Sequence, residues 1–104
     1  MREVLCFYIP CADRSKAEHL VQVLIQEGLI ACGNIIGANS HYIWEGKINE
    51  DAESIVIAKT LTYLENELES AIERLHEYDV PCIARWNIRV NDAYFSWMCE
   101  VIKS

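Results

Sequence analysis

ACGNIIGANSHYIWEGKINEDAESIVIAKT, residues 31–60, is the stretch that decides the fold of this chain. β-Branched and aromatic residues dominate it on both sides of the polar cluster 49–51, a pattern that predicts two strands joined by a turn. We therefore predict a long hairpin with arms at 31–48 and 52–60. At about 3.3 Å per residue an unbroken first arm would reach roughly 60 Å, so we expect a bend or bulges at 37–39 and at Gly46.

Even when bent, this hairpin is longer than the helices that can cover it. A helix of about 15 residues spans only about 22 Å. Part of the hairpin must therefore extend beyond its own helices and expose Tyr42, Ile43 and Trp44. We expect another chain to cover these side chains.

The remaining elements surround the hairpin in an order that indicates the topology. That order is βαββαβ with an added C-terminal helix, and right-handed crossovers then give an α+β, ferredoxin-like sandwich. Its four-stranded antiparallel sheet carries both main helices on one face, so burial of the other face predicts an oligomer. The predicted elements are a strand at 3–10, a helix capped by Asp13 or Ser15 and stopped at Gly28, a helix from Thr62 to about His76, a strand at 80–90 entered through Pro81, and a short helix from Asn91 or Asp92 to Ile102.

Size, charge and cysteine content limit the classes of function. We predict one domain at 1–104, which buries only about 60 to 70% of its unfolded surface and so benefits from association. A net charge of −7 excludes nucleic acid as an expected partner. No run is long enough for a membrane span, and the N-terminus lacks signal-peptide features, so we expect a cytoplasmic protein with no membrane partner. Five cysteines without a close pair argue against a disulfide framework.

Four spaced motifs resemble the CutA family, the divalent-cation tolerance proteins, over nearly the whole chain. The first two lie within LIACGNIIGANSHYIWEGKINED, residues 29–51. The motifs are Leu-x-Ala-Cys-x-Asn-Ile at 29–35, Tyr-x-Trp-x-Gly-Lys-Ile at 42–48, His-x-Tyr-acidic-Val-Pro at 76–81 and Asn-x-x-Tyr-x-x-Trp at 91–97. The resemblance implies a homotrimer of ferredoxin-like subunits in which each hairpin reaches a neighbour's sheet. It also implies a link to tolerance of copper and other divalent metals.

Some positions depart from the family pattern. Glu77, Cys82 and Val90 stand where the family commonly has Pro, Glu and Gly. Cysteines considered as metal ligands in some bacterial members correspond to Ile9 and Ala71 here. Of the family's candidate cysteines, only Cys32 is matched, which weakens a metal role inferred from the resemblance.

Cysteines supply three of the candidate metal ligands. Cys32 begins the long strand, where a thiolate can bind Cu(I), Cu(II) or Zn(II). The alternative is a small buried hydrophobic residue. Three copies of Cys32 converging on a trimer axis would form a site that no monomer contains. Cys11 ends the first strand and Cys82 opens the fourth, so these two can approach each other, His41 or His76.

His41 is the fourth candidate metal ligand. Alternation places it on one side of the hairpin with Glu45 and Lys47, and His41 with Glu45 can offer nitrogen and oxygen to a divalent ion. The alternative is a polar strand face or a set of intersubunit hydrogen bonds.

Aromatic and histidine side chains are the expected subunit contacts, because such residues are favoured in oligomer interfaces. His76 with Tyr78 and Asp79 is also where an acid–base pair would be sought. However, the sequence has no GxSxG, no HExxH and no glycine-rich phosphate loop, so we expect no enzyme and no required cofactor. The predicted interface residues are Tyr42, Trp44, His76, Tyr78, Tyr94 and Trp97.

Together these patterns predict a trimeric divalent-cation tolerance protein that binds or buffers divalent metal, copper above all, without catalysis. One alternative is a small-molecule sensor similar to the trimeric PII signalling proteins, which share the subunit fold and bind effectors between subunits. The chain lacks a basic phosphate site, so anionic nucleotides fit it poorly. The other alternative is a trimeric scaffold that docks an unidentified protein.

Overall fold

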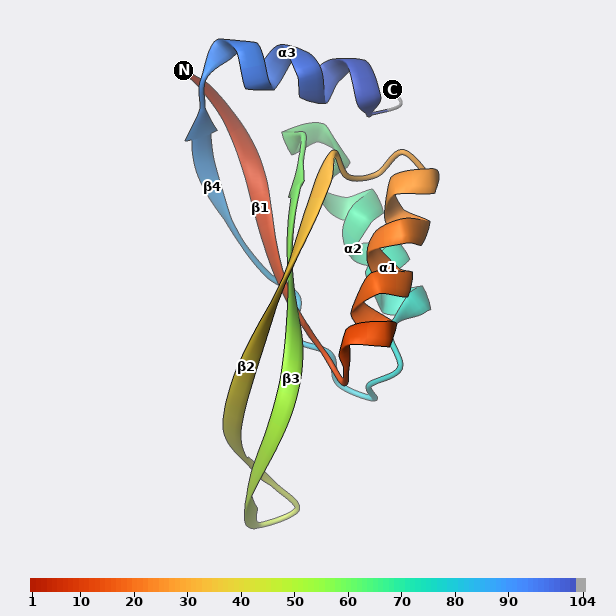
Figure 1. The fold of residues 1–104 in the computed structure, drawn as a ribbon, viewed down its shortest axis with the longest axis vertical. Coiled ribbons are helices and arrows are strands. Elements are labelled where there is room, and N and C mark those ends of the chain that lie inside the picture. Colours follow the sequence, from red (N-terminus) through yellow and green to blue (C-terminus); the bar gives the residue numbers. More distant parts are fainter. Residues whose placement is uncertain (103–104) are drawn as a thin grey trace.

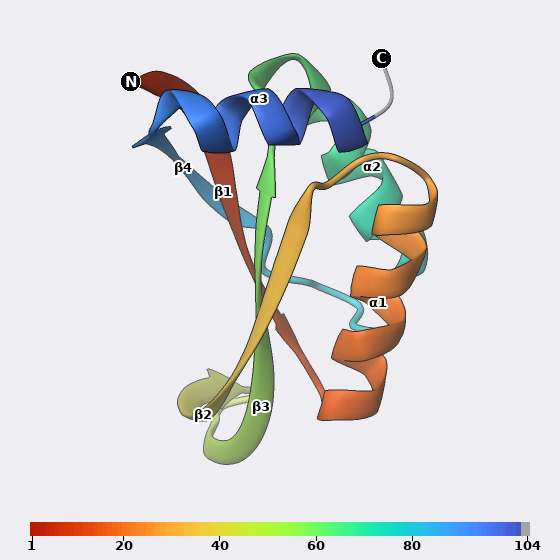
Figure 2. The ribbon, with the colours of Figure 1, turned by 45° about the horizontal axis from the view of Figure 1, so that its top comes forward.

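The predicted α+β fold is confirmed by a computed structural model that describes residues 1–102. Four strands form one antiparallel sheet in the order β2-β3-β1-β4. Helices α1 and α2 cover one face of this sheet, and α3 lies across one end of it (Figures 1 and 2). The elements are β1 (Arg2–Cys11), α1 (Arg14–Gln26), β2 (Cys32–Trp44), β3 (Lys47–Thr60), a short 3-10 turn η1 (Thr62–Leu64), α2 (Glu65–Leu75), β4 (Ala84–Val90) and α3 (Asp92–Val101).

The hairpin turns at Glu45 and Gly46, so the predicted turn at 49–51 is wrong. Both turn residues have positive φ, 52° and 78°, as required in the two-residue turns whose twist matches that of paired strands. The polar cluster lies inside β3 instead, where Asn49 pairs with Tyr42 and Asp51 with Ser40. Polar residues are tolerated there because this part of the strand is exposed to solvent.

The two hairpin arms pair without interruption, so the bulges predicted at 37–39 as one alternative are also wrong. The register runs continuously from Cys32 opposite Lys59 to Trp44 opposite Lys47. The first arm is shorter than predicted because the chain turns earlier, at Glu45 and Gly46, and this arm has 13 residues.

The predicted overhang is confirmed. Pairing of β3 with β1 ends at Ser54 opposite Cys11, so the hairpin beyond this point is only two strands wide. It extends past the ends of α1 and α2 in Figure 1, and the chain measures 46 × 24 × 21 Å. The exposed fractions of Ile43 and Ile48 are 73% and 81%.

Side chains alternate along the strands between two faces of the sheet: the helical face, which α1 and α2 cover, and the open face on the other side. Phe7, Ile9 and Val56 are buried on the helical face, where α1 and α2 supply Leu24 and Ile72 among others. Gly33 on the same face lets β2 approach α1, since an added Cβ would lie 2.8 Å from Val21. Only the end of the open face lies near α3.

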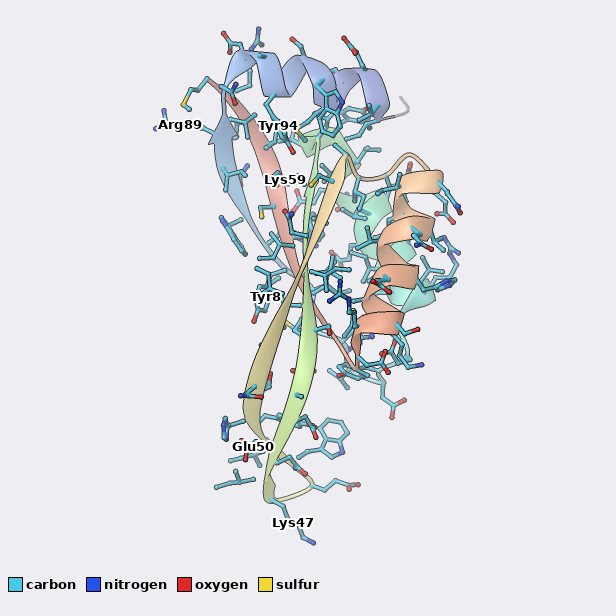
Figure 3. All side chains as sticks on the ribbon, viewed as in Figure 1. Tyr8, Lys47, Glu50, Lys59, Arg89 and Tyr94 are labelled. Atoms are coloured by element: carbon cyan, nitrogen blue, oxygen red, sulfur yellow. The ribbon has the colours of Figure 1, made fainter. Side chains whose placement is uncertain are left out.

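Much of the open face remains uncovered within one subunit. Ile36 on β2 and Trp86 on β4 belong to it by their register, and they are 51% and 46% exposed. Figure 3 shows Tyr8 on the side of the sheet away from α1 and α2. This apolar face is the surface that an oligomer would bury.

Strand β4 begins at Ala84, so the predicted start at Val80 is wrong. Its pairing with β1 ends at Ala84 opposite Tyr8. Two residues further along β1 stands Pro10, which has no N–H to donate to a ladder. Residues 76–83 therefore form an irregular loop between α2 and β4, and this loop builds one wall of the site described next.

Candidate functional site

A cavity of about 590 Å³ lies where the α2–β4 loop passes beside the hairpin overhang. Its size is within the range of ordinary small-molecule sites. It brings together His41 and Cys82, two of the residues singled out as metal ligands, and three of the predicted interface aromatics. The lining residues are Pro10, Ser40, His41, Tyr42, Trp44, Glu53, Glu77, Tyr78, Asp79, Val80 and Cys82.

His76 anchors the loop and has no free ring nitrogen. The Tyr78 N–H donates to its Nδ1 at 3.1 Å, so Nδ1 is an acceptor. Its Nε2 therefore carries the proton and donates to the Pro10 carbonyl at 2.7 Å. The side chain is fully buried. In this arrangement His76 is a structural group and neither a general base nor a metal ligand.

Two tyrosines of the cavity are each held by a carboxylate of β3. The Tyr78 hydroxyl donates to Glu53 Oε2 at 2.7 Å, and the Tyr42 hydroxyl donates to Asp51. Burial, then the hydrogen bond and charge of Glu53, raise the pKa of Tyr78. The hydrogen bond to Asp51 is the main cause that raises the pKa of Tyr42. Both hydroxyls therefore stay protonated and donate.

Cys32 lies at the opposite end of the molecule, on the free edge of the sheet. It is partly buried, and Lys59 Nζ lies 4.0 Å from its sulfur and 3.4 Å from Asn34 Oδ1. Lys59 Nζ also lies 5.8 Å from the ring centroid of Tyr94, and Figure 3 shows these two residues near α3. Burial, followed by the Cys32 thiol, raises the pKa of Tyr94. The cluster offers a sulfur, an ammonium group and a phenol.

Cys11 and Cys82 line different cavities. Cys11 is buried, and burial followed by the charges of Glu77, Glu53 and Asp13 raises its pKa to about 12, so its thiol stays protonated. It lines a smaller cavity with His76, Ser15 and His19. Cys82 is exposed in the α2–β4 loop and does not open β4, contrary to the prediction.

His41 faces Glu50 across the hairpin, with Nε2 3.6 Å from the carboxylate. The prediction that His41, Glu45 and Lys47 share one side is wrong. Glu45 is a turn residue. Lys47 pairs with Trp44, whose side chain lies on the opposite face of the strand from that of His41. Figure 3 shows Glu50 and Lys47 near the hairpin tip.

The four predicted metal ligands therefore occupy three places in the chain: His41 and Cys82 line the large cavity, Cys11 lines the smaller one, and Cys32 lies at the sheet edge. No group of three or more His, Cys, Asp or Glu side chains within residues 1–102 is placed to hold a metal ion. Sequence reasoning missed Glu53 and Asp51, the carboxylates that hold Tyr78 and Tyr42. Asp51 and Glu53 are two positions apart on β3, which indicates that they share one face of the strand. Only the correct turn gives the register that places Asp51 near Tyr42.

The remaining predicted interface residues lie on the surface of the chain. Trp44 and Trp97 are 49% and 41% exposed, and the rings of Tyr94 and Trp97 lie 5.4 Å apart on α3. Their role between subunits stays a prediction. No helix within the described residues is long and apolar enough to cross a membrane.

Comparison with known proteins identifies the relatives of this chain. The sequence model of the family described as CutA1 divalent ion tolerance protein matches residues 5–101. The chain is 42% identical over 101 residues to the divalent-cation tolerance protein CutA of Pyrococcus horikoshii, covering 96% of this chain and 99% of that protein.

Solved structures agree with this similarity. The crystal structure of CutA1 from Pyrococcus horikoshii superposes with a TM-score of 0.94 at 40% identity, covering 96% of this chain and 99% of that one. The periplasmic divalent cation tolerance protein CutA from Archaeoglobus fulgidus superposes with a TM-score of 0.91 at 29% identity, covering 98% and 100%. The match in sequence and fold over almost the whole length shows that the chain belongs to the CutA family of divalent-cation tolerance proteins.

Proposed function

We propose that the chain acts as a homotrimer that binds a divalent metal ion, copper above all, and catalyses no reaction. Membership of the divalent-cation tolerance family supports this role. The observation that carries the metal-binding step is that Cys32 and His41 both lie on β2, a strand at the free edge of the sheet. An edge strand has unpaired backbone groups, so a second copy can pair there and bring further ligands.

Both sheet edges favour assembly of identical chains. Within residues 1–102, β2 is unpaired on one side and β4 on the other. Pairing β2 of one copy with β4 of the next is a head-to-tail contact, and such contacts form a ring when the rotation between copies closes. The exposed Ile36 and Trp86 on the open face, and Trp44 on the overhang, supply apolar area for burial. The family resemblance implies that three copies form this ring.

A metal site completed between subunits also fits the chemistry of the separate ligands. Within residues 1–102 of one copy no three suitable side chains converge. A second copy paired along β2 would bring its own α2–β4 loop, with Cys82, toward that edge. The net charge of −7 favours the approach of cations.

The proposed absence of catalysis is based on the hydrogen bonds of His76. This residue is the histidine beside Tyr78 and Asp79, where an acid–base pair was sought, yet both its ring nitrogens are engaged in hydrogen bonds. A histidine that acts as a general base needs a free ring nitrogen within reach of a substrate. A cytoplasmic location, expected from the sequence, remains a prediction.

Native mass spectrometry of the reduced protein titrated with copper tests this proposal. We expect trimers that take up copper in a fixed, saturating ratio, and we expect Cys32→Ser to abolish that uptake. Cys99→Ser is the matched control, because Cys99 is exposed on α3. Metal-free trimers at saturating copper, or unchanged uptake by Cys32→Ser, would contradict metal binding. In a scaffold, by contrast, Cys32→Ser leaves function intact.

One observation favours a second function, a small-molecule sensor. The cavity of about 590 Å³ has aromatic walls and polar groups, the combination typical of ligand sites. A thermal-shift screen separates the two functions, since a ligand that binds the native state raises its stability. Stabilisation by a metabolite in the absence of metal would favour the sensor.

A further inference from the structure

Acidic side chains outnumber basic ones among the described lining residues of the large cavity, where His41 is the one histidine. Glu53, Glu77 and Asp79 contribute carboxylates, and neither Lys nor Arg lines it. Glu77 accepts a hydrogen bond from the Ala12 N–H at 3.3 Å, whereas Asp79 is exposed. A cavity with this charge attracts cations and repels phosphate or carboxylate ligands.

Aromatic side chains from two separate elements line the same cavity. Tyr42 and Trp44 come from β2, and Tyr78 comes from the α2–β4 loop; all three are also predicted subunit contacts, so in a trimer the cavity would lie at a subunit boundary. Aromatic rings attract ammonium and guanidinium cations through their faces. The cavity thus combines rings and carboxylates that favour one class of ligand.

Hydrogen bonds hold these walls in place without a ligand. Glu53 fixes the Tyr78 hydroxyl, and Asp51 fixes that of Tyr42. His76 ties the loop to Pro10 through its ring. A site whose side chains are already ordered loses less conformational entropy when it binds.

We propose that this cavity binds a small organic cation, an alkylammonium or guanidinium group carried on an apolar body. A metal ion is a poorer fit, because it needs converging ligands and no group of three suitable side chains converges within residues 1–102. An extended organic cation can use separate carboxylates and aromatic faces together. The inference rests on the sensor function proposed above; His41 and Cys82, which line this cavity, are also candidate metal ligands, whereas Cys32 lies outside it.

Calorimetric titration of the full chain with matched probes tests the inference. Benzyltrimethylammonium supplies the cation, benzyl alcohol the same ring without charge, and benzoate the opposite charge. We expect saturable binding of the cation alone, weakened by added salt because the attraction is electrostatic. Glu53→Gln keeps an oxygen that can accept from Tyr78 but removes the charge, and should weaken binding by roughly fivefold to thirtyfold.

Two further variants keep the result interpretable. Asp79→Asn removes a charge that makes no hydrogen bond within the described chain, so it should weaken binding without disturbing the fold. Glu3→Gln removes a charge that does not line the cavity and should bind as the unaltered protein does. If benzyl alcohol bound with equal affinity, the inference that the ligand is a cation would be wrong, although a sensor function would remain. If no probe binds while copper does, the inference fails and metal binding survives.

Discussion

The hydroxyl of Tyr78 donates a hydrogen bond of 2.7 Å to Oε2 of Glu53, and this contact joins the α2–β4 loop to the hairpin. The two residues are 25 positions apart in the sequence. The contact fixes one aromatic wall of the cavity against the strand that supplies a carboxylate to it. Stability and ligand binding should therefore both depend on it.

A double-mutant cycle measures the strength of this contact. Tyr78→Phe and Glu53→Ala should each lower the free energy of unfolding, because a hydrogen bond to a charged group contributes about 1.5 to 3 kcal/mol. The double variant should lose less free energy of unfolding than the sum of the losses in the two single variants. Urea unfolding of the four proteins gives the coupling energy, and strictly additive losses would show that the contact contributes nothing.

His76→Leu should be among the more destabilising substitutions in this chain. It leaves the Pro10 carbonyl and the Tyr78 N–H without their partner, at about 1 to 3 kcal/mol for each unsatisfied group that stays buried. His19→Leu on the exposed face of α1 is the control and should change stability little. Chemical unfolding of both variants provides the measurement. A His76→Leu protein as stable as its control would refute the structural role of His76.

Two glycines on β2 should respond differently to alanine. At Gly33 the added Cβ would lie 2.8 Å from Val21, whereas at Gly37 it would meet nothing within 4 Å. Gly33→Ala should therefore destabilise the protein by about 1 to 3 kcal/mol through overpacking. Gly37→Ala should be neutral or slightly stabilising, since alanine restricts the unfolded chain. Thermal unfolding compares the pair, and equal midpoints would contradict the close approach of β2 to α1.

Cys11 should make stability depend on alkaline pH. Burial raises the pKa of its thiol to about 12, above the ordinary value of 9.0 that applies in the unfolded chain. The folded state therefore holds this proton where the unfolded state releases it. The contribution to stability is complete below pH 9.0 and is lost as the pH rises toward about 12.

The measurement for Cys11 is unfolding between pH 8 and 11, with Cys11→Ala as the comparison. The unaltered protein should lose more stability over this range than the variant does. Alkylation followed by mass spectrometry gives a second readout, because a buried protonated thiol resists the reagent while exposed Cys99 reacts. Equal labelling of both thiols in the native state would contradict the burial of Cys11.

Trp44→Ala should weaken the proposed trimer. If the ring is buried between subunits, its loss costs about 3 to 5 kcal/mol. Ile25→Ala is the control, because Ile25 is exposed on α1 and is not among the predicted subunit contacts. Analytical ultracentrifugation over a range of concentrations reports the assembly. An unchanged trimer at nanomolar concentration would exclude Trp44 as an important contact.

Much of the fold was predictable because its signals are local. Asp13 caps α1 by accepting from the Lys16 N–H at 2.9 Å, and Gly28 ends that helix with a φ of 73°. Helical spacing of Leu20, Val21 and Leu24 likewise predicted the face that α1 buries. Each of these features depends on a few neighbouring residues, which sequence reasoning can weigh directly.

The candidate site was less predictable because one local error spread through it. Placing the turn at 49–51 instead of at Glu45 and Gly46 changes which residue lies opposite which in the hairpin. That error put His41 on the same side of the hairpin as Lys47 and hid its actual cross-strand neighbour, Glu50. In a strand, a shift of one residue moves each side chain to the other face.

Hydrophobic period, capping residues and glycines alone were sufficient for the order of the elements, the long hairpin and its overhang, since these patterns act over a few residues. Only the folded chain decided that His76 meets Pro10, that Tyr78 meets Glu53, and that Cys32 lies far from the cavity lined by His41 and Cys82. Such meetings depend on strand register and on the path of the α2–β4 loop. Both are set by packing across the whole sheet, between residues that no local pattern connects.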